Sequence, residues 1–62
     1  MRDNLARAIR ERDGRNLSRI LDKLRFSFGY DYDATYEAAR RAVPDLTLPE
    51  WDELLRDADT AA

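Results

Sequence analysis

A chain of 62 residues has room for one hydrophobic core and no second domain. Its content of 44% hydrophobic residues is typical of a folded protein rather than a disordered one. The sequence contains no Cys and no His, which excludes disulfides, thiolate nucleophiles, soft-metal sites and imidazole acid–base chemistry.

The first segment in which hydrophobic residues recur with helical spacing covers residues 3–13. Its narrow apolar stripe consists of Leu5, Ala8 and Ile9. Gly14 follows directly, at the place where many helices end on a left-handed residue. We therefore expect a first helix that is closed by Gly14.

The second segment, residues 16–28, has the clearest amphipathic pattern in the chain. Asn16 is a favourable N-cap, and Gly29 is expected to end the helix. The apolar face lies within about 100° of arc around the helix axis. It is formed by Leu17, Ile20, Leu21, Leu24 and Phe28.

A third helix is expected over residues 33–43, with Asp33 as its N-cap and Pro44 as its end. Proline lacks an amide hydrogen and disfavours the helical conformation in the residue before it. The inner face of this helix is formed by Tyr36, Ala39 and Val43, with Ala42 at its edge.

The fourth helix, residues 48–58, has the strongest start signal. Thr47 and Glu50 have the spacing of a capping box, and Leu46 and Trp51 have that of a hydrophobic staple. The core-facing stripe consists of Trp51, Leu54, Leu55 and Ala58, with Trp51 as an anchor of the core. The remaining tail, residues 59–62, is expected to fray.

These elements predict an all-α fold, a compact mini-bundle of three to four short amphipathic helices that forms a single domain over residues 1–62. Short connections bring sequential helices together, and no segment has the alternation of a strand. A core of this size leaves a thin stability margin. We therefore also expect that leftover apolar surface promotes self-association.

Charge is divided unevenly along the chain. Residues 1–25 carry eight basic and four acidic side chains, for +4, whereas residues 26–62 carry three basic and nine acidic ones, for −6. One interpretation, which we favour, is that the two halves neutralise each other across the bundle and through i,i+4 pairs such as Asp3–Arg7 and Arg7–Glu11. The other is a protein with two charged faces, one of them available to an acidic partner.

Candidate partner-binding residues begin in the second helix. Arg15, Arg19 and Lys23 lie on the side opposite the apolar face, and Phe26 lies on that same side. The ordinary explanation, which we favour, is that the first helix or the 29–33 loop covers Phe26. The alternative is an exposed patch of arginine and aromatic side chains, the residue types that dominate interface hot spots.

The loop of residues 28–33, FGYDYD, is the most unusual local feature. We expect Phe28 and Tyr32 to fill the core and the carboxylates to cap the third helix. The alternative is a contact surface that includes Tyr30 and Asp31. The complete candidate set for partner binding is Arg15, Arg19, Lys23, Phe26, Tyr30 and Asp31.

The chain offers little for metal binding or catalysis. Asp31, Asp33 and Thr35 have the spacing of the start of a calcium loop, but Tyr36 and Ala42 replace its glycine and its bidentate glutamate. The serines and threonines have no histidine base. We expect no metal, no cofactor and no enzymatic activity.

By elimination, the sequence predicts a non-enzymatic module that binds another protein, such as a small regulator, inhibitor or adaptor of the kind that bacteria and phages encode. The alternatives are a nucleic-acid-binding protein, or an antitoxin-like module that combines DNA and protein binding. The net charge of −2 argues against nucleic acid. No apolar run reaches the ~18–20 residues of a membrane span, so we expect a cytoplasmic protein. The basic residues available to a nucleic acid are Arg7, Arg10, Arg15, Arg19 and Lys23.

Overall fold

The computed structural model describes residues 2–61 and confirms the all-α mini-bundle. Within these residues the chain forms helices and their connections, without strands. The elements in chain order are α1 (Arg2–Glu11), α2 (Gly14–Asp22), the π-helical segment η1 (Lys23–Ser27), α3 (Tyr32–Ala42) and α4 (Leu48–Ala61).

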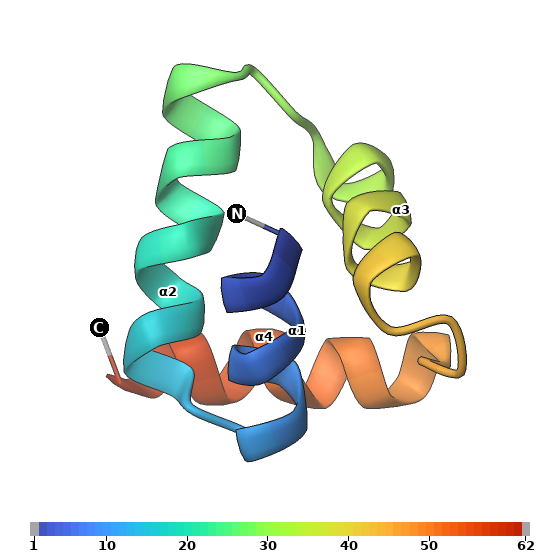
Figure 1. Cartoon of the computed structure of the whole chain (residues 1–62). Helices are drawn as coiled ribbons and strands as arrows, with labels where there is room; N and C mark the ends of the chain where they lie inside the picture. The colour runs from blue at the N-terminus through green and yellow to red at the C-terminus, as the bar shows by residue number, and fades with distance from the viewer. Residues whose placement is uncertain (1, 62) are drawn as a thin grey trace.

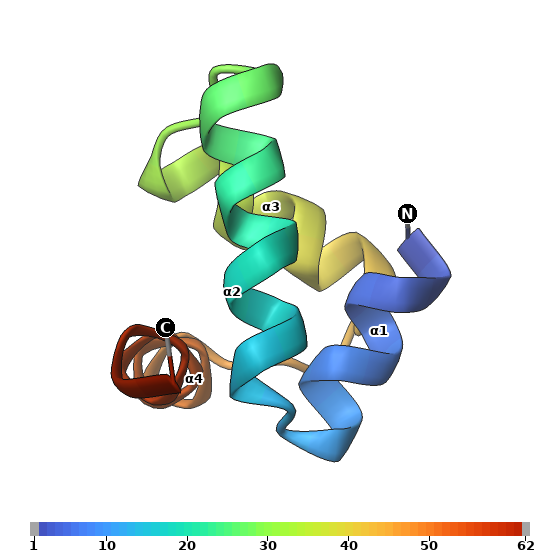
Figure 2. The same cartoon turned by 90° about the vertical axis from the view of Figure 1, so that its left-hand side faces the viewer.

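The helices surround one core. α2 and η1 form a continuous column, α1 lies beside it, and α3 stands on the other side of α1 (Figure 1). α4 crosses the base of this arrangement and is seen end-on in Figure 2. The most extensive contacts are those of α2 with α4, followed by those of α1 with α3. The molecule measures 25 × 23 × 20 Å along its principal axes.

The core is built from the predicted apolar stripes, with Trp51 and Leu17 fully buried at its centre. The ring of Tyr36 packs against Trp51 with a centroid separation of 6.4 Å. Thr35, which the helical pattern did not indicate, is also buried, and its hydroxyl donates to the carbonyl of Tyr32 at 2.7 Å. The buried hydrophobic residues are Leu5, Ala8, Ile9, Leu17, Ile20, Leu21, Leu24, Ala39, Val43, Leu46, Trp51, Leu54 and Ala58.

The junction between α1 and α2 differs from the prediction. The left-handed residue is Arg12, with φ of 53°, and not Gly14. The N-cap of α2 is Asp13, whose carboxylate accepts from the amide of Asn16 at 3.3 Å, so the prediction of Asn16 as the cap is wrong. Gly14 already belongs to α2, where a Cβ atom would lie 2.9 Å from the carbonyl oxygen of Asp57 in α4. Glycine is needed here for close helix packing rather than for a turn.

The boundaries of α3 also shift. Gly29, with φ of +70°, closes the preceding helical column as predicted. The N-cap of α3 is Asp31 rather than Asp33, because the Asp31 carboxylate accepts from the amide of Ala34 at 2.9 Å. At the other end, α3 stops at Ala42, two residues before the proline.

The start of α4 confirms the capping box. The Thr47 hydroxyl oxygen accepts from the amide of Glu50 at 3.4 Å, and the Glu50 carboxylate accepts from the amide of Thr47 at 3.3 Å. Both members of the predicted staple, Leu46 and Trp51, are buried. The expectation of a frayed tail is wrong for residues 59–61, which continue α4, and residue 62 lies outside the described residues. Among residues 2–61, no helix is both long and apolar enough to cross a bilayer.

Candidate interaction surface

The end of the α2–η1 column departs from regular α-helix. Over Lys23–Ser27 the backbone is π-helical, and the amide of Tyr30 donates to the carbonyl of Leu24 at 3.0 Å. An i→i+5 turn holds one residue more than an α-helical turn, so later residues are displaced around the axis by roughly one position, about 100°. Leu24 stays in the core, but Phe28, which was predicted to continue the apolar stripe, is carried away from it.

Four aromatic side chains are exposed at this end of the molecule. The exposed fraction is 84% for Phe26, 54% for Phe28, 37% for Tyr30 and 44% for Tyr32. We call these four residues the aromatic end. The expectation that the first helix or the loop covers Phe26 is wrong, as is the expectation that Phe28 and Tyr32 fill the core. The extra residue of the π turn is the physical reason for the exposure of Phe28.

Side-chain contacts order part of the aromatic end, and one of them joins it to α4. The rings of Phe28 and Tyr30 are tilted against each other with centroids 6.0 Å apart. The hydroxyl of Tyr32 donates to the carboxylate of Asp52 in α4 at 2.5 Å. This hydrogen bond favours the protonated phenol and, with desolvation and the charge of Asp52, raises the pKa of Tyr32 to about 12. The carboxylate of Asp31 is occupied as the N-cap of α3.

The basic candidates Arg15, Arg19 and Lys23 follow one another at helical-turn spacing along the α2–η1 column, and all three are exposed. None of them forms an ion pair with any residue between 2 and 61. Arg19 and Lys23 border a hollow of about 240 Å³ together with Asn4 and Ile20. Their charges are thus available at the surface.

Charge neutralisation takes place across the bundle rather than along α1. The two predicted i,i+4 pairs of Arg7 are not formed within 4.0 Å. Instead, Arg10 pairs with Asp45 at 3.9 Å, and Arg12 pairs with Glu53 at 3.4 Å. The favoured interpretation of the charge division therefore holds only for these two contacts, both of which lie at exposed side chains.

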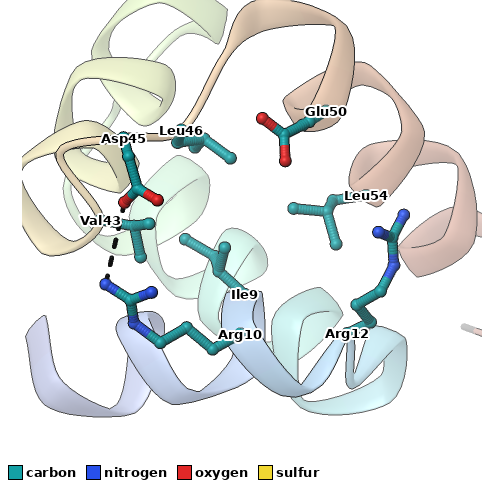
Figure 3. A pocket seen from close by; sticks show the side chains of 8 residues that line it. All are labelled: Ile9, Arg10, Arg12, Val43, Asp45, Leu46, Glu50 and Leu54. Carbon is teal, nitrogen blue, oxygen red and sulfur yellow. Dashed lines mark ion pairs between the residues drawn. The ribbon is translucent and has the colours of Figure 1, made fainter.

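Both arginines border a small pocket in which α1 meets α4 and the loop before it (Figure 3). Apolar side chains form its inner wall, and charged groups of both signs surround the opening. Its volume of about 180 Å³ is below the ~300 Å³ at which small-molecule pockets begin. Its lining consists of Ile9, Arg10, Arg12, Val43, Asp45, Leu46, Glu50 and Leu54. Within residues 2–61, no group of acidic side chains is arranged to hold a metal ion.

A third hollow, of about 190 Å³, lies between the start of α1, η1, the following loop and α3. This hollow was not predicted from the sequence. Arg2 stands three residues before Leu5, and Arg41 stands three residues after Ala38, so each arginine shares a helix face with an apolar residue. Nothing in that spacing indicates that the two faces meet. The lining consists of Arg2, Leu5, Leu24, Tyr30, Ala38 and Arg41.

The structure thus distributes the six predicted residues over distinct places. Phe26 and Tyr30 belong to the aromatic end, Asp31 caps α3, and the three basic residues continue down the column. Comparison of the chain with protein-family models, with curated proteins and with solved structures gave no match.

Proposed function

We propose that the protein is a small non-enzymatic module that binds another protein, as a regulator, inhibitor or adaptor, through the aromatic end. The observation that carries this proposal is the exposure of Phe26, Phe28, Tyr30 and Tyr32 on one short stretch of chain. Clustered apolar surface on a small protein is characteristic of interaction sites.

The chemistry of these side chains favours a protein partner. Burial of one phenylalanine side chain stabilises a complex by about 1.5–3 kcal/mol. Tyrosine adds a rigid ring with a polar tip, and aromatic residues and arginine are enriched among interface hot spots. Since Tyr32 is fixed by its hydrogen bond to Asp52, part of this surface is ordered before a partner binds.

A second candidate is nucleic-acid binding, and one observation favours it. Among residues 2–61, Phe26 is the most exposed large hydrophobic residue, and it belongs to η1 together with Lys23 and Arg25. An exposed ring beside basic side chains can stack on a base while the cations contact phosphates. Such binding weakens steeply as the salt concentration rises, whereas contacts centred on aromatic burial do not. An antitoxin-like module would combine both modes.

Site-specific photo-crosslinking in the native host tests the proposal. A benzophenone amino acid replaces Phe26 in one variant and Leu48 in a matched control. Leu48 is a large exposed hydrophobic residue at the start of α4 that is not a member of the aromatic end, and its exposed fraction is 45%. We expect a discrete protein adduct from position 26 and none from position 48.

Substitution completes the test. Phe26→Ser should abolish recovery of the crosslinked protein in a pull-down, and Leu48→Ser should leave recovery unchanged. Equal recovery by both variants contradicts the proposal, and an adduct removed by nuclease supports the nucleic-acid alternative. An adduct with the mass of two copies of the chain, matched by light scattering at two concentrations, would identify a second copy as the occupant.

A further inference from the structure

We propose that the hollow between α1, η1 and α3 receives an apolar side chain from an acidic segment of the partner protein, whose carboxylates are bound by Arg2 and Arg41. This inference rests on the proposed function, because it names the chemistry of the segment that the module binds. Three observations carry it: the size of the hollow, its charge, and its continuity with the aromatic end.

The size and lining suit a single side chain. An engineered apolar cavity of about 150 Å³ in another protein binds benzene, so a hollow of about 190 Å³ has room for one ring or one branched alkyl group. Its inner wall is formed by the buried residues Leu5 and Leu24 and the half-buried Ala38, and the ring of Tyr30 stands beside them. An apolar group that enters this space is removed from water on the side that faces these residues.

The charge at the opening is of one sign. Arg2 and Arg41 border the hollow, no acidic side chain lines it, and neither arginine is ion-paired with any residue from 2 to 61. The pocket in Figure 3 is different, because Asp45 and Glu50 accompany its arginines. A guanidinium group binds a carboxylate through two parallel hydrogen bonds. An occupant that brings its own carboxylates therefore complements both the apolar wall and the charged opening.

Helix stability does not explain the position of Arg2. It lies in the first turn of α1, where a cation opposes the helix dipole, whereas Arg41 lies in the last turn of α3, where a cation is favourable. The N-terminal part of α1 lies between the α2–η1 column and α3 in Figure 1. An anionic segment at this place would offset the unfavourable position of Arg2.

The hollow is continuous with the aromatic end through one residue. Tyr30 lines the hollow, and its ring contacts that of Phe28. A segment that inserts one apolar side chain beside Tyr30 would therefore extend over exposed aromatic surface. The arginines at the hollow favour an acidic segment of the partner, and the aromatic end provides additional apolar contact area for that segment.

Titrations with three short peptides, followed in ¹H–¹⁵N NMR spectra of the full chain, test the inference. The probes are acetyl-Glu-Leu-Phe-Glu-amide, a neutral version with Gln in place of Glu, and a version with Ser in place of both apolar residues. We expect the first peptide to shift the amide signals of Leu5, Leu24 and Ala38. The neutral peptide should bind about five- to tenfold more weakly, since hydrogen bonds to charged groups are the stronger ones. The serine version should not bind.

Two arginines on the same turn of α3 provide a matched pair of variants. Arg41→Gln should weaken binding of the acidic peptide about five- to tenfold. Arg40→Gln should leave it unchanged, because the guanidinium of Arg40 lies over the ring of Tyr36, at 5.9 Å from its centroid, and does not line the hollow. A further variant, Ala38→Leu, should fill the hollow and abolish binding of the acidic peptide. The NMR signals of residues away from α3 should keep their positions in this variant.

The inference is overturned if the neutral peptide binds as tightly as the acidic one, or if Arg40→Gln and Arg41→Gln weaken binding equally. It is also overturned if an eight-nucleotide oligothymidylate shifts the same signals and the acidic peptide shifts none. Its failure is distinguishable from that of the proposed function. If the peptide does not bind but the crosslink from position 26 forms, only the inference about the hollow is contradicted. If the peptide binds but no protein adduct forms, only the proposed role of the aromatic end is contradicted.

Discussion

Replacement of Gly14 by alanine should destabilise the protein, although the same change stabilises most helices. Gly14 is the first residue of α2 and has no left-handed φ, so alanine suits its backbone. A Cβ atom at this position would, however, lie 2.9 Å from the carbonyl oxygen of Asp57 and 3.3 Å from the Cβ of Ala61. Both neighbours belong to α4, so neither moves without shifting that helix.

The two effects have opposite signs and different sizes. Alanine in place of glycine within a helix contributes roughly 0.5–1 kcal/mol of stability. Overpacking at a close contact costs about 1–3 kcal/mol, and the contact with a backbone carbonyl leaves no flexible side chain to relax. We expect Gly14→Ala to lower the free energy of unfolding by about 1–2 kcal/mol. In a domain of this length, that corresponds to a fall in Tm of about 5–15 °C.

Urea and thermal denaturation, followed by far-UV circular dichroism, measure the effect. Ser18→Ala in the same helix is the control for helix propensity and should be neutral or slightly stabilising. Adding Ala61→Gly to the Gly14→Ala variant should recover part of the loss, because it removes the 3.3 Å contact but leaves the carbonyl contact. A Gly14→Ala protein more stable than the wild type would show that α2 and α4 are not in such close approach.

At Gly29, φ is +70° and no atom lies within 4 Å of an added Cβ. L-Alanine at this position should therefore lower the free energy of unfolding by about 1 kcal/mol through backbone strain alone, whereas D-alanine, introduced by chemical synthesis, should not lower it. Equal losses of stability in urea titrations of the two variants would contradict this. Trp51→Ala should remove about 3–5 kcal/mol of stability. Trp51→Phe should cost distinctly less, because the indole N–H of Trp51 is buried without a hydrogen-bond partner and its loss breaks no hydrogen bond. A Phe variant as unstable as the Ala variant would refute this. The raised pKa of Tyr32 means that its hydrogen bond to Asp52 stabilises the fold below pH 10 and that this contribution is lost as the pH rises toward about 12. Phenolate absorbance should therefore show one late-titrating tyrosine that disappears in Tyr32→Phe and persists in Tyr30→Phe.

Most of the core could be predicted from the sequence because it follows helical periodicity, with Thr35 as the exception. The α1 stripe and the α2 stripe as far as Leu24 are buried as their spacing indicates, and so is the α4 stripe apart from the half-buried Leu55. The capping box at Thr47 is equally local, since both partners lie within one turn. Such features can be predicted from the geometry of a single helix, because the residues involved lie within a few positions of one another in the sequence.

The errors share a different physical cause. Gly14 was taken as a conformational signal, whereas its role depends on the distance to α4, which no local pattern contains. Exposure of Phe28 follows from one additional residue in a helical turn, and sequence periodicity at 100° per residue assumes that no such turn exists. The hollow bordered by Arg2 and Arg41 requires two helix ends to meet. In each case the deciding quantity is a tertiary distance or a local change of helix type.

The closest helix packing and the exposed phenylalanines lie at different ends of the molecule. The base, where α2 crosses α4, contains the Gly14 contact and the pair of Arg12 with Glu53 (Figure 1). The other end holds exposed Phe26 and Phe28. A phenylalanine left in water forgoes about 1.5–3 kcal/mol of burial, against a total stability of only about 3–9 kcal/mol for a domain of this length. Polar residues at these two positions would remove the apolar exposure at no cost to the core. Their presence close in sequence to Tyr30, which lines the hollow bordered by Arg2 and Arg41, therefore supports the proposed binding of a partner.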